Sequence, residues 1–258
     1  MCTGVNFAGV NLPYMLVGVN IDLMVFSATA KRGYHHGDLR NALAEAAAKL
    51  AQSGGPEKVT VRAAARSVGV TPTAAYRHFA GHEELLAAAK EHCGRRLGEM
   101  VQRQLIALPA TGSRVQLALR NLVAAGRAYI NFALEEPGLF RTAFSQGGAI
   151  LDKEPAEFTG DANALGILVG LLDELVAAGY LAPERRPMAE IAAWSSVHGL
   201  ALLMLDGPLR DVSVEAKAEA ITRTTMLMLR GLGDLTSELE AGLPATGPRT
   251  ALPGRADP

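Results

Sequence analysis

The sequence predicts an all-α protein: a three-helix unit that contains a helix-turn-helix, followed by a larger helical domain. Hydrophobic residues make up 49% of the 258 residues, whereas aromatic residues make up only 5%, a balance that favours packed helices over sheets. Apolar residues also recur at helical spacing in successive segments, which clusters of Pro and Gly separate. The chain is long enough to bury a sizeable core.

The first helix is predicted from about Asp38 to Gly54. Its apolar residues fall at helical spacing: Leu39, Leu43, Ala46, Ala47 and Leu50. The segment Gly54-Gly55-Pro56 ends the helix, because glycine favours the left-handed backbone of a C-terminus and proline lacks the N–H that a helix needs.

Two short helices follow, joined by a tight turn. Thr60 is expected to cap the first of them, over 61–68, and Gly69 to supply the turn. Thr71-Pro72 places an N-cap and a proline at the start of the next helix, which is expected to run to about Phe79. Two short helices joined in this way form a helix-turn-helix.

A larger helical domain is predicted over 83–235, after a helix-turn-helix domain over 31–82. His82 opens a long helix that reaches about Ile106, with acidic residues in its first turn. Further amphipathic helices are expected over 113–135, 139–144, 162–178, 188–206 and 214–232.

The two termini differ from the segments between them. Residues 1–30 repeat Gly-Val-Asn three times, and we interpret them either as a disordered extension or as a mis-assigned one, with Met24 as the true start. Residues 236–258 are rich in Pro, Gly, Ala and Thr and are expected to form a disordered tail.

Charge is distributed unevenly along the chain. The net charge of -1 argues by itself against a nucleic-acid-binding protein. Residues 31–80, however, carry a net charge of +5, which leaves -6 for the remainder. A basic DNA-binding domain joined to an acidic partner domain would give this asymmetry.

The two cysteines, Cys2 and Cys93, are far apart and predict neither a disulfide framework nor a zinc site. A reducing, cytoplasmic location fits this pattern, and the start of the chain is a poor match to a signal peptide. We expect no membrane anchor, no metal and no cofactor.

Several segments closely resemble the TetR family of transcriptional regulators. They are Tyr76-Arg-His-Phe79, Gly81-His-Glu-Glu-Leu-Leu86 and the Gly-Gly at the end of the first helix, and the resemblance is specific over about 37–90. Trp194-Ser-Ser-Val-His198-Gly199 and Tyr34-His-His-Gly-Asp-Leu39 resemble a subgroup named for its Trp, His and Gly. The resemblance implies a homodimer that binds palindromic operator DNA and an unknown small-molecule effector.

The resemblance and the predicted groove side of the helix-turn-helix together give a set of DNA-contacting residues. These are Lys31, Arg32, Thr60, Arg62, Thr71, Thr73, Ala74, Tyr76, Arg77, His78 and His82. The resemblance implies phosphate contacts for Thr60, Arg62, Tyr76 and His78. It implies base-edge contacts for Thr73 and Ala74.

Three features of this set affect how the protein is expected to bind DNA. Thr73 and Ala74 cannot make bidentate bonds to a base, so direct readout is expected to rely on Arg62, Arg77 and groove shape. His82 stands where the family usually has Lys, which predicts a weaker or pH-dependent phosphate contact. The arm that carries Lys31 and Arg32 is expected to track phosphates or enter a minor groove.

The larger domain is expected to bind the effector around Trp194 and His198. Two interpretations stay open here: plain core, or an apolar cavity in which His198 is the polar handle. The residues concerned are Tyr129, Phe132, Phe140, Phe144, Trp194 and His198.

The last two helices carry apolar faces that are either core or a dimer interface. The residues concerned are Ala192, Leu200, Leu203, Ile221, Thr225, Met228 and Leu229. The resemblance implies that two copies pair here as a four-helix bundle, which places two recognition helices in successive major grooves. The effector is expected to swing the fourth helix and so to change that spacing.

Two alternatives to a repressor remain. An activator fits the sequence equally well, since the location of the operator decides between the two. A small-molecule-binding protein or an enzyme with a vestigial helix-turn-helix belongs to another class. Ser195, His198 and Asp206 suggest a nucleophilic triad, but the strand-turn elbow that exposes such a serine is missing, so we expect no enzymatic activity.

Overall fold

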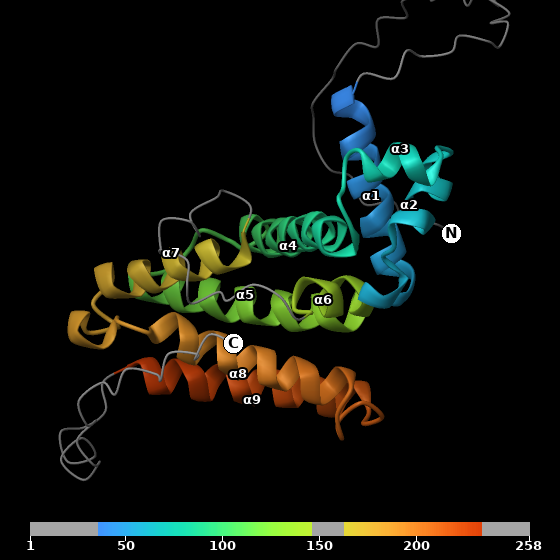
Figure 1. Ribbon diagram of the computed structural model, residues 1–258. Coiled ribbons are helices and arrows are strands. Elements are labelled where there is room, and N and C mark those ends of the chain that lie inside the picture. Colours follow the sequence, from blue (N-terminus) through green and yellow to red (C-terminus); the bar gives the residue numbers. More distant parts are fainter. Residues whose placement is uncertain (1–35, 146–162, 234–258) are drawn as a thin grey trace, which may run out of the picture. The chain divides into compact units, whose positions relative to one another are not determined.

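The computed structural model describes residues 36–145 and 163–233 (Figure 1). The described residues form helices joined by turns and contain no strand, which confirms the all-α prediction. The predicted extension over 1–30, the arm with Lys31 and Arg32, and the tail over 236–258 lie outside the described residues. No helix among the described residues is long and apolar enough to cross a membrane.

The first part of the fold, which we call the head, consists of three helices. They are α1 (His36–Gly54), α2 (Val61–Val68) and α3 (Pro72–Tyr76), with a 3-10 turn η1 (Pro56–Lys58) before α2. The predicted caps are confirmed: Thr60 accepts a hydrogen bond from the amide of Ala63, and Thr71 accepts one from the amide of Ala74. Small residues that include Ala47, Ala65 and Ala75 are fully buried, so the three helices approach closely.

Helix α3 ends earlier than the sequence predicts. It stops at Tyr76, and Arg77 and His78 form a turn. Phe79 is buried at 1% exposure, and the amide of Ala80 donates to the carboxylate of Glu84 instead of continuing the helix. The chain therefore leaves the helix in order to bury Phe79 and begin the next one.

The remaining helices form the second part of the fold, which we call the body. They are α4 (His82–Ile106), α5 (Arg114–Glu135), α6 (Pro137–Ala143), α7 (Ala164–Ala177), α8 (Ala189–Leu205) and α9 (Val214–Leu232), with a 3-10 turn η4 (Pro183–Arg185). Helix α5 packs against α4, α6, α7, α8 and α9, and α8 and α9 lie side by side (Figure 1). Because α5 packs against so many helices, its fully buried residues form the centre of the body's core. These are Leu122, Ile130 and Phe132.

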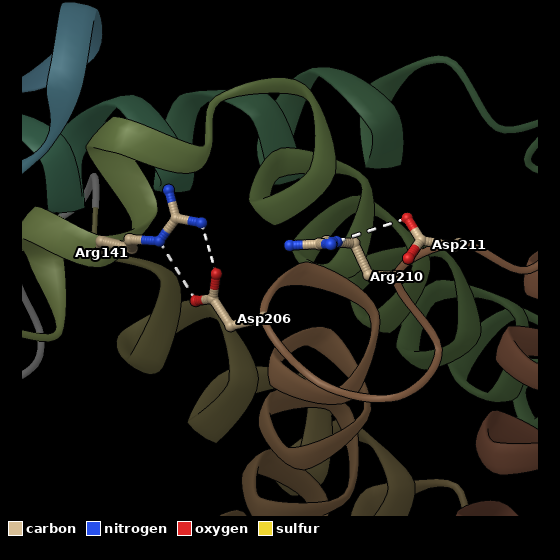
Figure 2. A network of polar contacts seen from close by, with 4 residues as sticks. All are labelled: Arg141, Asp206, Arg210 and Asp211. Atoms are coloured by element: carbon tan, nitrogen blue, oxygen red, sulfur yellow. Dashed lines mark hydrogen bonds and ion pairs between the residues drawn. The ribbon is translucent and has the colours of Figure 1, made fainter.

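Helix α6 connects the head to the body. A Cβ on Gly138 would lie 2.2 Å from the carbonyl oxygen of Ala51, so α6 touches the backbone of α1 directly. Beside this contact, the Gln52 amide donates to the Glu136 carboxylate at 2.9 Å. At the other end of α6, the Arg141 guanidinium donates two hydrogen bonds to Asp206, which follows α8 (Figure 2). Those bonds lower the pKa of Asp206.

Candidate nucleic-acid interface and aromatic cluster

The head presents most of the predicted DNA-contacting side chains to solvent. Thr60, Arg62, Thr71, Thr73, Tyr76, Arg77 and His82 are exposed, and Ala74 and His78 are half-buried. The opposite side of the helix-turn-helix is packed, because Val61 and Ala75 are buried and Val70 is half-buried. The short α3 thus has one free face, and the exposed residues of α2 and of the α4 N-terminus flank it.

The two capping threonines keep a hydrogen-bond donor. Each uses its hydroxyl oxygen to accept from a backbone amide, Thr60 at 3.1 Å and Thr71 at 3.2 Å. A hydroxyl has one hydrogen to donate as well. Both side chains can therefore cap a helix and donate to a phosphate oxygen at the same time.

Arg40 on α1 fixes the turn that follows α3. Its guanidinium donates to the carbonyl oxygen of His78 and to the Glu84 carboxylate, the latter at 2.9 Å, and lies 4.4 Å from the centre of the Phe79 ring. The Glu84 carboxylate also accepts from the amide of Ala80 at 2.8 Å. Both bonds lower the pKa of Glu84, and the bond from the Ala80 amide has the larger effect.

In the sequence, Arg40 is recognisable only as part of the basic charge of residues 31–80. The structure instead pairs it with an acid 44 residues away. No local pattern marks such a pair. Arg40 is therefore a positioning residue that holds the end of α3 against the start of α4.

His78 and His82 lie in different elements of the fold. His78 lies in the turn after α3, whereas His82 is the first residue of α4. Within residues 36–145 and 163–233, no group of three or more His, Cys, Asp or Glu side chains is placed to hold a metal ion.

An aromatic cluster joins α5, α6 and α8 in the body. It consists of Tyr129, Phe140, Phe144, Trp194 and His198, which are five of the six residues predicted for the effector site. The centre of the Phe144 ring lies 4.9 Å from that of Phe140 and 4.8 Å from that of His198. The sixth residue, Phe132, is fully buried and makes no ring contact with the cluster among the described residues.

Hydrogen bonds tie three members of the cluster together. The Trp194 indole N–H donates to the Tyr129 hydroxyl at 2.9 Å, and that hydroxyl lies 2.7 Å from Nδ1 of His198. Burial raises the pKa of Tyr129 above its usual range and lowers the pKa of His198. Asp206, the third member of the suggested triad, bonds to Arg141 instead, so within the described part of the chain no acid is paired with His198.

The lowered pKa of His198 predicts a loss of stability in acid. The unfolded chain takes up a proton near the ordinary histidine pKa of 6.5, whereas the folded chain takes it up only at lower pH. Between the two values the unfolded state binds more protons, so the free energy of unfolding falls as the pH drops through this window.

Urea unfolding at about pH 7.5 and about pH 5.5 measures this loss. His198→Asn is the control, because its amide oxygen accepts the Tyr129 hydrogen bond but does not titrate. The native chain is expected to lose more stability than this variant. Equal losses in the two proteins would assign the pH dependence to other groups.

A groove among the described residues lies away from the aromatic cluster. It has a volume of about 450 Å³ between α5, α8 and α9 and is lined mainly by apolar side chains, with Arg210 and Lys217 among them. Figure 2 shows Arg210 beside Asp211, to which it donates at 3.3 Å. None of the six residues predicted for the effector site lines this groove.

For the apolar faces of the last two helices, the structure assigns four of the named residues to the core. Leu200, Ile221, Thr225 and Leu229 are buried within the chain's own core, and Met228 is half-buried. Ala192 and Leu203 are exposed. The large apolar residues that the last two helices expose in addition are Leu202, Val214, Met226 and Leu227.

Comparisons with known proteins bear on both parts of the fold. The model described as "Bacterial regulatory proteins, tetR family" matches residues 43–89, and the one described as "Tetracyclin repressor-like, C-terminal domain" matches residues 122–231. The first covers the helix-turn-helix and the start of α4, and the second extends from α5 to α9. No curated protein matches the sequence.

Several solved structures share the fold. A protein of unknown function from Rhodococcus sp. RHA1 is 26% identical, with a TM-score of 0.61 over 79% of this chain and 100% of that one. TetR family transcription regulators from Marinobacter aquaeolei VT8 and Pectobacterium atrosepticum are 18% and 20% identical, both with a TM-score of 0.55. They cover 76% and 78% of this chain, and 96% of their own chains is matched.

The likeness therefore extends through the head and the body. The two family models together match more than half of the residues, and they follow each other along the chain in the same order as the head and the body. The chain belongs to the TetR family of bacterial transcription regulators.

Proposed function

We propose that this protein is a ligand-responsive repressor that acts as a homodimer on a palindromic operator. The observation that carries the proposal is the exposed face of the helix-turn-helix, where Arg62, Tyr76 and Arg77 are free of the core. Arg40 holds this face in one orientation relative to α4. A rigid, basic and exposed helix-turn-helix is suited to a major groove.

The proposed DNA contacts divide into two classes. Thr60, Arg62, Tyr76 and His78 contact phosphates, which supply affinity and register. Thr73 and Ala74 contact base edges, and Arg62 and Arg77 contribute further readout. Thr71, His82, Lys31 and Arg32 complete the proposed interface.

The proposed effector site is the aromatic cluster together with Phe132, which is fully buried in the core. Phe140 belongs to α6 and Phe144 directly follows it, and α6 in turn touches α1 at Gly138. Lys90 of α4 also donates to the carbonyl oxygen of Ser145, just after α6, at 2.7 Å. An effector that displaces these phenylalanines moves α6, and through it α1 and α4, so the spacing of the two heads changes.

The DNA interface is tested by the salt dependence of binding. Purified protein is titrated onto the DNA upstream of its own gene at several salt concentrations between about 50 and 200 mM. The double variant Arg62→Ala, Tyr76→Phe is expected to bind more weakly and to lower the salt slope by about 1, because one cationic phosphate contact is lost.

Arg103→Ala serves as the control for this experiment. It removes the same charge from the exposed last turn of α4, where Arg103 donates to the carbonyl oxygen of Glu99 in its own helix. Its affinity and salt slope are expected to equal those of the native chain. The assignment fails if the double variant binds with the native slope.

A further inference from the structure

The hydrogen bonds of the aromatic cluster have only one arrangement that satisfies every donor. Trp194 can only donate through its indole N–H, so the Tyr129 oxygen is the acceptor of that bond. The hydroxyl hydrogen of Tyr129 then needs an acceptor, because leaving it unpaired in a buried site is unfavourable. Among the described residues, Nδ1 of His198, at 2.7 Å, is the acceptor available.

This direction of bonding fixes the tautomer of His198. Nδ1 accepts a hydrogen bond and therefore carries no proton, so the neutral imidazole has its hydrogen on Nε2. Burial lowers the pKa of this side chain, which keeps the ring neutral at ordinary pH. Nε2 has no hydrogen-bond partner among the described residues.

Aromatic rings surround the imidazole of His198. Phe140 stacks on the imidazole with 5.5 Å between the ring centres and 30° between the planes. Phe144 meets it edge-on at 4.8 Å, and the Trp194 ring lies 5.7 Å away. Trp194, Phe144 and His198 are each half-buried, whereas Tyr129 and Phe140 beneath them are buried.

We propose that the effector is an uncharged aromatic molecule whose carbonyl oxygen accepts a hydrogen bond from Nε2 of His198. This inference rests on the proposed effector site. None of the five side chains of the cluster is a carboxylate or a fixed cation, so none of them neutralises a charged ligand. An aryl ketone, quinone or lactone meets these requirements, since each combines a flat ring with a carbonyl acceptor.

A matched set of probes tests the ligand class. These are 2-acetylnaphthalene, which has a ketone, 2-ethylnaphthalene, which has the same skeleton without an acceptor, and the anion 2-naphthoate. Affinities are measured by equilibrium dialysis, and the fluorescence of Trp194, the single tryptophan of the chain, locates the bound probe. The ketone is expected to bind about tenfold more tightly than the hydrocarbon, the effect of one hydrogen bond in an apolar site.

Two variants assign the preference to the proposed donor. His198→Phe keeps the aromatic character of the site and is expected to bind ketone and hydrocarbon equally. Tyr129→Phe removes the hydroxyl that fixes the tautomer and is expected to reduce the preference while the hydrocarbon still binds. Circular dichroism confirms that each variant is folded.

The outcomes separate this inference from the proposed function. Equal binding of ketone and hydrocarbon by the native chain overturns the ligand class but leaves the cluster as the site. Tighter binding of the naphthoate overturns the uncharged class. If no probe alters Trp194 fluorescence, the cluster is not the effector site, and that part of the proposed function fails with it.

Discussion

Replacing Gly138 by alanine is expected to destabilise the protein by roughly 3 kcal/mol, the upper range for overpacking a close contact. The new methyl carbon would lie 2.2 Å from the carbonyl oxygen of Ala51 and 2.7 Å from that of Gln52. Both atoms belong to the α1 backbone, so no side-chain rotation relieves the clash. Ala51 is itself fully buried, which prevents α1 from moving away alone. The helices α1 and α6 must therefore separate.

Urea unfolding measures the loss of stability, and operator affinity reports the displaced head. Gly170→Ala on α7 is a matched control, because nothing lies within 4 Å of a Cβ at that position. When alanine replaces a helical glycine that has no such contact, the free energy of unfolding rises by up to about 1 kcal/mol. If the two variants behave alike, the head and the body are not joined by a close contact at α6.

The local features of the fold could be predicted because short-range chemistry determines them. The N-caps at Thr60 and Thr71 and the turn at Gly69 follow from the residue types alone, and the structure has each in place. The end of α3 could not be predicted in this way. It depends on the burial of Phe79 and on Arg40, whose partners lie 38 and 44 residues away.

The aromatic cluster illustrates a similar limit. The size and hydrophobicity of the side chains predict its members. The hydrogen bonds among Tyr129, Trp194 and His198 could not be predicted, because they join residues 65 and 69 positions apart. Which side of α8 faces the core was harder to predict. That helix is apolar on nearly every side, so periodicity alone does not show that Leu200 faces the core and Leu203 faces solvent.

The double variant Leu203→Glu, Leu227→Glu is expected to convert the proposed dimer into a monomer. Along α8 the exposed residues are Ala192, Ser195, Gly199, Leu202 and Leu203, and along α9 they include Ala216, Glu219, Arg223, Met226 and Leu227. Both sets repeat at intervals of three and four residues, so each lies on one side of its helix. Small residues on the α8 side allow another helix to approach closely.

The exposed leucines make this face suited to a second copy of the chain. Leu203 is 44% exposed and Leu227 is 66% exposed, and an interface would bury both. A glutamate at either position would leave an unpaired charge in that interface, which is strongly unfavourable. A monomer binds only one operator half-site at a time, so operator affinity is expected to fall at least about 100-fold, the usual gain from linking two sites.

Analytical ultracentrifugation gives the oligomeric state, and titration of operator DNA gives the affinity. Val214→Glu is the control, because Val214 is 77% exposed on α9 but lines the groove toward α5 rather than the proposed dimer face. This variant is expected to remain a dimer with native affinity. A double variant that stays dimeric would show that the two copies pair through another surface. A double variant that becomes monomeric but keeps native affinity would show that pairing does not set the spacing of the heads.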